Sequence, residues 1–230
     1  MGSQHGNSNE RPAHEVLVSG FYLDRYAVTN DEYREFVLAN PEWRKGAVAP
    51  EKAHEHYLNL WTGVEFPPEL TGYAVINVSW WAAMAYAAWI GKRLPTEAEW
   101  EFAAGGKHHQ KWSLGDSFDP ALYSFAVDSD PVGFKVGGYP PNEYGLHEMS
   151  GGSWEWTRDC YAVEYYERSP RENPINLVDK ERRALRGGSC HFEDPAYLRC
   201  TVRGSNRPEA CHEDYSFRCA ADGRGRDAHS

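Results

Sequence analysis

The chain has 230 residues, a formal net charge of −10, 41% hydrophobic side chains and 14% aromatic ones. This length suits one large domain or two small ones and buries a sizeable core without metals or disulfides. An acidic chain lacks the basic footprint that nucleic acid or an anionic membrane requires, so we expect a protein or small-molecule partner and no nucleic acid.

The first elements along the chain are two strands and a helix. Residues 15–18 and 21–23 have strand-like patterns rich in β-branched, leucine and aromatic side chains, which predicts strands. Thr29 and Glu32 match a capping box, which opens a predicted helix over residues 30–39. Its apolar residues recur at helical spacing, so one face should meet the core.

Two more helices are predicted after a long irregular segment over residues 41–74. Ser79 is a suitable N-cap for a helix over residues 80–90 that is apolar nearly all round and should therefore be buried. A second capping box opens a shorter helix over residues 97–104. From residue 107 onward the sequence is typical of loops and short strands, because short apolar runs alternate with Gly, Pro, Asn and Asp.

The simplest organisation is one domain over residues 1–230, because the sequence has no repeat and no linker. We expect residues 1–12 and 222–230 to be loose ends. No apolar run reaches the roughly 18 residues of a membrane-spanning helix, so no membrane span is expected. The polar N-terminus shows no secretory signal, which favours the cytoplasm without fixing the compartment.

Several motifs along nearly the whole chain resemble those of the formylglycine-generating-enzyme, or sulfatase-modifying-factor, family. The longest is GKRLPTEAEWE at 91–101, and the others are FYLD at 21–24, NVSW at 77–80, YGL at 144–146, GGSWEWT at 151–157, RGGS at 186–189 and FRCA at 217–220. The resemblance implies a compact α+β fold of the C-type-lectin-like type. Two or three helices, short strands and much irregular loop would agree with the elements predicted above.

The catalytic cysteines of that family are missing. Enzymes of the family oxidise a substrate cysteine to formylglycine with molecular oxygen and copper held by two cysteines, which as soft thiolates select Cu(I). The matching positions here are Phe192 and either Ala196 or Tyr197. Neither can ligate Cu(I), so we expect no copper and no formylglycine-generating activity.

Five cysteines remain, an odd number that argues against a complete disulfide framework. Cys190 and Cys200 are the nearest substitutes for the missing pair. A returning loop could bring them together, or both could be isolated core thiols. Cys200 and Cys219 match structural cysteines of some relatives, but the partner positions lie near Ala87 and Ala103, so those disulfides are not expected.

A calcium site is the second expectation from the resemblance. In relatives, a loop through the W-E-W motif binds Ca²⁺, and the matching positions are Glu148, Ser150, Gly151, Ser153 and Glu155. Two carboxylates and the carbonyls of a glycine-rich turn suit this hard cation. The alternative is that Glu155 makes buried hydrogen bonds instead.

The C-terminal loops give the main functional hypothesis, a ligand-binding module. The same fold is the scaffold of variable proteins diversified by retroelements, and this chain has a similar framework around two loops rich in aromatic and polar residues. The candidate binding residues are His191, Phe192, Glu193, Asp194, Tyr197, His212, Glu213, Asp214 and Tyr215. We expect the segments 190–197 and 211–215 to lie on one face, the alternative being that Phe192 and Tyr197 merely fill the core.

Two other functions stay open. The first is an oxidoreductase with different chemistry, for example in the oxidative maturation of a peptide natural product. Its candidate acid–base groups would be His191, Glu193, His212 and Tyr215. The second is an inert paralogue that supports a partner.

Overall fold

The computed structural model describes residues 1–126, 133–178 and 181–223. Within these ranges the α-helices are α1 (Asn30–Ala39), α2 (Trp80–Trp89), α3 (Glu97–Gly105) and α4 (Tyr165–Arg168). The strands are β1 (Phe21–Leu23), β2 (Trp154–Cys160), β3 (Arg183–Arg186), β4 (Gly204–Asn206), β5 (Tyr215–Ser216) and β6 (Ala220–Asp222). Short 3₁₀ helices are η1 (Ser8–Glu10), η2 (Pro41–Trp43), η3 (Pro68–Leu70), η4 (Pro120–Leu122) and η5 (Pro195–Leu198). The predicted α+β class with much irregular loop is confirmed.

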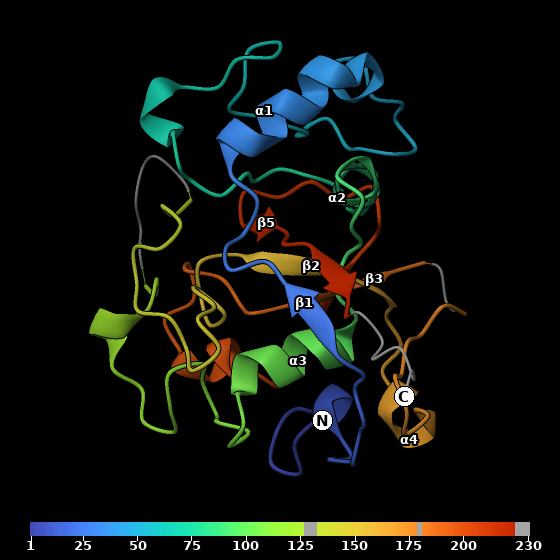
Figure 1. Cartoon of the computed structure of the whole chain (residues 1–230), viewed down its shortest axis with the longest axis vertical. Helices are drawn as coiled ribbons and strands as arrows, with labels where there is room; N and C mark the ends of the chain where they lie inside the picture. The colour runs from blue at the N-terminus through green and yellow to red at the C-terminus, as the bar shows by residue number, and fades with distance from the viewer. Residues whose placement is uncertain (127–132, 179–180, 224–230) are drawn as a thin grey trace, which may run out of the picture.

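The strands form two small sheets (Figure 1). The larger has the order β4-β3-β2-β5, in which only the β2–β5 pair is parallel. The smaller pairs β1 with β6 in antiparallel register, so that Phe21 lies opposite Asp222. This pairing brings residues 21–23 beside residues 220–222, close to the end of the described chain.

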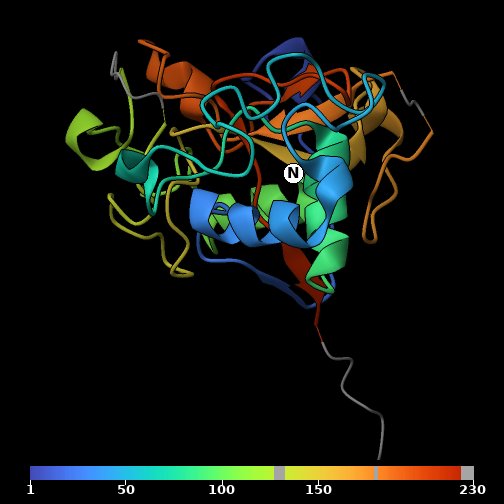
Figure 2. The same cartoon turned by 90° about the horizontal axis from the view of Figure 1, so that it is seen from above.

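The helices cover the larger sheet from two sides. Figure 1 shows α2 above β2 and α3 below it, and both helices contact that strand. α1 packs on α2 through Tyr33, whose ring stacks on Tyr86 at 5.6 Å. Seen from above, α1 crosses in front of the sheet region (Figure 2). None of the helices in the described ranges is long and apolar enough to cross a membrane.

Local sequence patterns explain where the helices begin. The Thr29 side chain accepts a hydrogen bond from the Glu32 amide while Glu32 reaches back, and Thr96 and Glu99 do the same at the start of α3. These capping boxes satisfy amides that have no partner within the helix. The predicted bounds of α1 and α3 therefore agree with the structure to within one residue.

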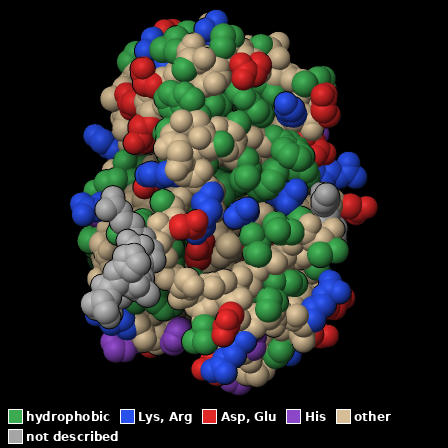
Figure 3. Space-filling view, turned by 45° about the vertical axis from the view of Figure 1, so that its right-hand side comes forward, with side chains coloured by type: hydrophobic (Ala, Val, Ile, Leu, Met, Phe, Trp, Pro, Cys, Tyr) green, Lys and Arg blue, Asp and Glu red, His purple; other side chains and the backbone are tan. Residues whose placement is uncertain are grey.

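The expectation that the second helix is buried on all sides is wrong in part. Ala82 and Ala87 are fully buried, but Trp81 and Trp89 are 37% and 43% exposed. Small alanine side chains let α2 approach the sheet closely, while the bulky tryptophans lie on the outer face. Figure 3 shows hydrophobic side chains gathered in the upper half of one face, among charges of both signs.

The N-terminal expectations are also corrected. Residues 15–18 form no strand, because only Leu17 makes an isolated bridge, to Glu172. Residues 1–12 are not a loose end: Glu10 is fully buried and its carboxylate binds Arg199 at 2.8 Å and Thr201 at 2.6 Å. The other predicted loose end, 222–230, lies largely outside the described residues.

Candidate ligand-binding site

The segment after β3 folds back on itself at two glycines. Gly187 and Gly188 have φ values of 102° and 77°, and a Cβ on Gly188 would lie 2.5 Å from the Tyr197 carbonyl oxygen. Only glycine fits such a position. Beyond the turn, Asp194 caps η5 by accepting a hydrogen bond from the Ala196 amide at 2.8 Å. As a result the rings of Phe192 and Tyr197 stack at 4.7 Å with an interplanar angle of 21°.

The segment 211–215 carries a second set of side chains. His212 Nδ1 lies 2.6 Å from Asp214 Oδ1, and the His212 ring is 5.2 Å from the Tyr215 ring. The Tyr215 hydroxyl accepts a hydrogen bond from Asn206 at 3.0 Å. β5 then pairs with β2, which places Tyr215 beside Trp154.

Trp154 joins the two segments. Its amide donates to the Asp214 carbonyl at 2.8 Å, and its ring meets that of Phe192 edge-on at 6.1 Å. Gly204 makes room for this ring, since a Cβ there would lie 2.8 Å from it. The segments 190–197 and 211–215 therefore border one surface, which we call the aromatic surface and define by Trp154, Phe192, Tyr197, His212 and Tyr215. Figure 1 shows β5 beside β2, with the orange η5 below them to the left.

Trp154 is not among the predicted site residues, because its motif GGSWEWT indicated the family and a calcium loop and nothing about ligand binding. Strand alternation offered no signal either, because residues i and i+2 share a face and Trp156 is fully buried whereas Trp154 is half-buried.

Two side chains of the aromatic surface, Tyr197 and His212, are exposed, and the other three are half-buried. Tyr197 is 46% exposed, and His191, Glu193, Asp194, His212 and Glu213 are exposed as well. Phe192, Asp214 and Tyr215 are half-buried. Phe192 also packs against the buried cluster of Trp112, Tyr123 and Leu198. The surface is thus anchored in the core through Phe192 and open to solvent through Tyr197.

The positions that the resemblance matches with the copper-binding cysteines lie in and next to this stack. The positions that match the family cysteines hold Phe192 and, near it, Ala196 and Tyr197, of which the two aromatic rings lie face to face. Carbon rings offer no thiolate to Cu(I). The residues present therefore do not fit the copper site of the enzymes.

The nearby cysteines do not replace that pair. Cys190 and Cys200 are both buried free thiols. Burial and then the Asp214 carboxylate raise the pKa of Cys190 to about 11, and burial raises the pKa of Cys200 to about 12. Both thiols are protonated at neutral pH, so neither is an activated nucleophile.

The predicted calcium residues fall into separate environments. The Glu148 carboxylate accepts hydrogen bonds from the amides of Gly137 at 3.1 Å and Tyr139 at 3.2 Å, and burial raises its pKa. Glu148 and Ser150 line a small cavity of about 10 Å³. That volume is near the lower limit for holding one water-sized particle.

The other three calcium candidates lie in β2 or just before it: Glu155 in the strand, and Gly151 and Ser153 in the residues that precede it. Glu155 binds Arg218 at 2.8 Å and accepts a hydrogen bond from the Trp100 indole at 2.9 Å. The Ser153 hydroxyl bonds that of Ser216, and the Gly151 amide donates to the Gly187 carbonyl at 2.8 Å. In residues 1–126, 133–178 and 181–223, no three His, Cys, Asp or Glu side chains gather into a metal-binding group.

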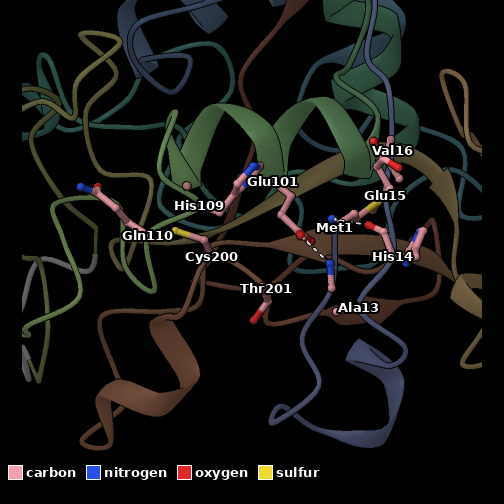
Figure 4. Close-up of a pocket in the computed structure, with 12 residues that line it drawn as sticks. Met1, Ala13, His14, Glu15, Val16, Glu101, His109, Gln110, Cys200 and Thr201 are labelled. Atoms are coloured by element: carbon pink, nitrogen blue, oxygen red, sulfur yellow. Dashed lines mark hydrogen bonds between the residues drawn. The ribbon is translucent and has the colours of Figure 1, made fainter.

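A cavity of about 460 Å³ lies under α3, between the N-terminal segment and residues 200–201 (Figure 4). Figure 4 shows Glu101 reaching down from α3 into it, with Cys200 on one side and His14 on the other. The Glu101 carboxylate is already bound by Arg186 at 2.5 Å and by the Gly2 amide at 2.6 Å. In this cavity the Glu101 carboxylate is therefore occupied and the Cys200 thiol is protonated. The cavity is for this reason a weaker candidate site than the aromatic surface.

Comparison with known proteins places this arrangement in a family. The family described as "Sulfatase-modifying factor enzyme 1-like domain" matches residues 1–223. The formylglycine-generating enzyme of Mus musculus is 32% identical over 93% of this chain and 69% of its own length. The inactive C-alpha-formylglycine-generating enzyme 2 of Bos taurus is 33% identical over 97% of this chain and 84% of its own.

A third relative is much longer than this chain. The serine/threonine-protein kinase pkn1 of Chlamydia caviae is 35% identical over 95% of the chain, which spans only 36% of that kinase.

Two solved structures show the fold. PvdO from Pseudomonas aeruginosa has a TM-score of 0.78 at 23% identity, covering 97% of this chain and 90% of its own. Treponema denticola variable protein 1 has a TM-score of 0.69 at 22% identity, covering 96% and 91%. The chain therefore belongs to the formylglycine-generating-enzyme family and has its C-type-lectin-like fold.

Proposed function

We propose that this domain is a ligand-binding module and that the aromatic surface is its binding site. The observation that carries the proposal is the Phe192–Tyr197 stack. The resemblance to the family matches Phe192 and either Ala196 or Tyr197 with the copper-binding cysteines of its enzymes. Exposed aromatic side chains beside adaptable polar ones are typical of recognition surfaces. The tight turn at Gly188 and the cap of η5 hold this surface on a rigid core, which limits the entropy lost on binding.

Two relatives are compatible with this function. The Bos taurus relative is described as inactive, so the family includes members without the enzymatic activity. The Treponema denticola neighbour is a variable protein, and it shares the scaffold. A finer form of the proposal is that the loops of this chain are diversified by a retroelement. An adjacent reverse transcriptase gene with a near-copy of the sequence encoding these loops would support it.

An oxidoreductase with different chemistry is a second candidate, favoured by the His212–Asp214 contact. A histidine held by a carboxylate suits proton transfer. Tyr215 lies next to this pair, but burial raises its pKa, so its hydroxyl stays protonated. An enzyme would be revealed by a mass change in a bound peptide that His212→Gln abolishes while binding persists.

The experiment that tests the binding module is a selection of displayed random peptides on the folded protein, followed by measurement of their affinities. Tyr197→Ala should weaken the selected binders at least about tenfold, as central aromatic contacts do. The matched control is Tyr144→Ala, another exposed tyrosine. Equal affinities for the wild type and Tyr197→Ala would overturn the proposal.

The same protein should also be incubated with copper, oxygen and a C-x-P-x-R peptide. We expect no aldehyde product, because Phe192 and Tyr197 cannot hold Cu(I). Repeated turnover, seen as the mass of formylglycine in the peptide, would contradict the proposal.

A bound Ca²⁺ near Glu148 is proposed as a separate, structural feature. A buried carboxylate with a raised pKa, beside a serine and a small cavity, provides oxygen ligands of the kind that calcium prefers. Glu155 would contribute only if it left Arg218.

A further inference from the structure

Acidic side chains border the aromatic surface on both of its segments. Glu193 and Asp194 come from one segment, and Glu213 and Asp214 from the other. Glu193 and Glu213 are exposed, and no basic side chain in the described ranges forms an ion pair with either. Burial, and then the charges of Asp214 and Glu213, raise the pKa of Cys190, which lies two residues before Phe192.

The neighbouring basic side chains of this chain are engaged elsewhere. Arg199, two residues beyond Tyr197, binds the buried carboxylate of Glu10 at 2.8 Å and the Ala196 carbonyl at 2.9 Å. Arg182, which acts electrostatically on Tyr215, donates to the Ser205 hydroxyl at 2.9 Å. The charge of Arg199 is therefore taken up by Glu10, whereas Arg182 keeps its charge near Tyr215 but forms no ion pair with Glu193 or Glu213 among the described residues.

The exposed rings are suited to a cation. A guanidinium or ammonium group is attracted to the face of an aromatic ring within about 6 Å. The chain uses this contact elsewhere, since Arg183 lies 3.8 Å from the ring centre of Trp80 and Lys111 lies 4.3 Å from that of Trp112. Tyr197 is 46% exposed, and no such contact covers it among the described residues.

We propose that the aromatic surface takes a cationic peptide segment, with an arginine or lysine side chain laid on the Tyr197–Phe192 stack and Glu193 and Glu213 beside it. The inference rests on the proposed function and specifies the chemistry of its ligand. Aromatic rings supply contact area to any peptide, whereas the two unpaired carboxylates attract only cationic ones. Exposed carboxylates also make the association sensitive to salt.

The test uses the displayed random peptides described above, with the selected sequences then made as free peptides. We expect enrichment of arginine and lysine, and replacement of the central arginine by citrulline should weaken binding about tenfold. Citrulline keeps the shape of arginine and removes its charge. Glu193→Gln together with Glu213→Gln should weaken binding about 2- to 30-fold, the range expected for two exposed ion pairs.

A charge-matched control separates this effect from the overall negative charge. Glu51→Gln together with Glu69→Gln removes the same charge from exposed sites in the segment between α1 and α2, and it should leave the affinity unchanged. If binders depend on Tyr197 but show no preference for cations, the inference fails and the proposed function stands. The inference also fails if both double variants weaken binding equally. If no binder depends on Tyr197, the proposed function fails and the inference with it.

Discussion

Charged side chains have opposite environments in the interior under α3 and at the aromatic surface. Under α3, Arg203 binds both oxygens of Glu97 at 2.8 and 3.0 Å, and Arg186 binds Glu101 at 2.5 Å, with all four side chains buried. At the aromatic surface, Glu193 is exposed and is not part of an ion pair among the described residues.

The contrast separates stability from recognition. A buried charge must be paired because water no longer solvates it, so the pairs under α3 fix how the elements pack. An exposed charge costs little to leave unpaired, so it remains available to a partner. Substitutions in the two regions should accordingly affect different measurements.

The largest expected effect is that of Arg203→Met. It leaves the buried Glu97 carboxylate without its bidentate partner, which should lower the free energy of unfolding by about 3–5 kcal/mol. Urea denaturation measures this change. Arg182→Met, at an exposed arginine, should change the value by less than about 0.5 kcal/mol. Adding Glu97→Gln to Arg203→Met should recover part of the lost free energy of unfolding. An Arg203→Met variant as stable as the wild type would contradict the contrast between the two regions.

The pH dependence of stability is the second test. Burial, and then the charge of Glu97, raise the pKa of Asp159 to about 7. Folded Asp159 therefore keeps its proton where the unfolded chain has lost it, so its contribution to stability falls as pH rises from about 4 to about 7.

Asp159→Asn should flatten this dependence by about 3–4 kcal/mol across that window. Its absolute stability should also fall, because Oδ2 accepts a hydrogen bond from the Glu97 amide and Oδ1 accepts one from the Asn176 amide, and asparagine keeps only one oxygen. Urea denaturation at several pH values separates the change in the pH dependence of stability from the loss of stability that does not depend on pH. Parallel curves for wild type and variant would show that Asp159 does not titrate in this range.

Glu148 is an exception within the comparison, because its buried carboxylate binds backbone amides and not a basic side chain. If Ca²⁺ binds there, calcium at about ten times its Kd should stabilise the fold by about 1.4 kcal/mol. Thermal melting with calcium and with a chelator measures the shift. Glu148→Gln should abolish it and Glu167→Gln, at an exposed site, should not; no shift in calcium-depleted wild type would count against the site.

The smallest expected effect on stability is that of Tyr197→Ala. The side chain is half exposed and stacks on a single ring, so its loss should lower the free energy of unfolding by about 1 kcal/mol or less. The same variant should nevertheless lose peptide binding. A loss of several kcal/mol would place Tyr197 in the core and remove the distinction between the two regions.

Sequence by itself determined the features that depend on neighbouring residues. The capping boxes at Thr29 and Thr96 predicted where α1 and α3 begin, because a cap and its partner lie three residues apart. The motifs identified the family and hence the fold. The resemblance also implied that Phe192 and either Ala196 or Tyr197 stand at the positions of the copper ligands, which stays a prediction.

Only the tertiary structure decided the features that join distant residues. Glu10 binds Arg199 across 189 positions, and Trp154 reaches the segment 211–215 only because β5 pairs with β2. The exposed tryptophans of α2 were not predictable, because an apolar pattern does not say which face meets the sheet. Contacts within a turn of helix follow from local spacing, whereas these contacts depend on how the whole chain returns on itself.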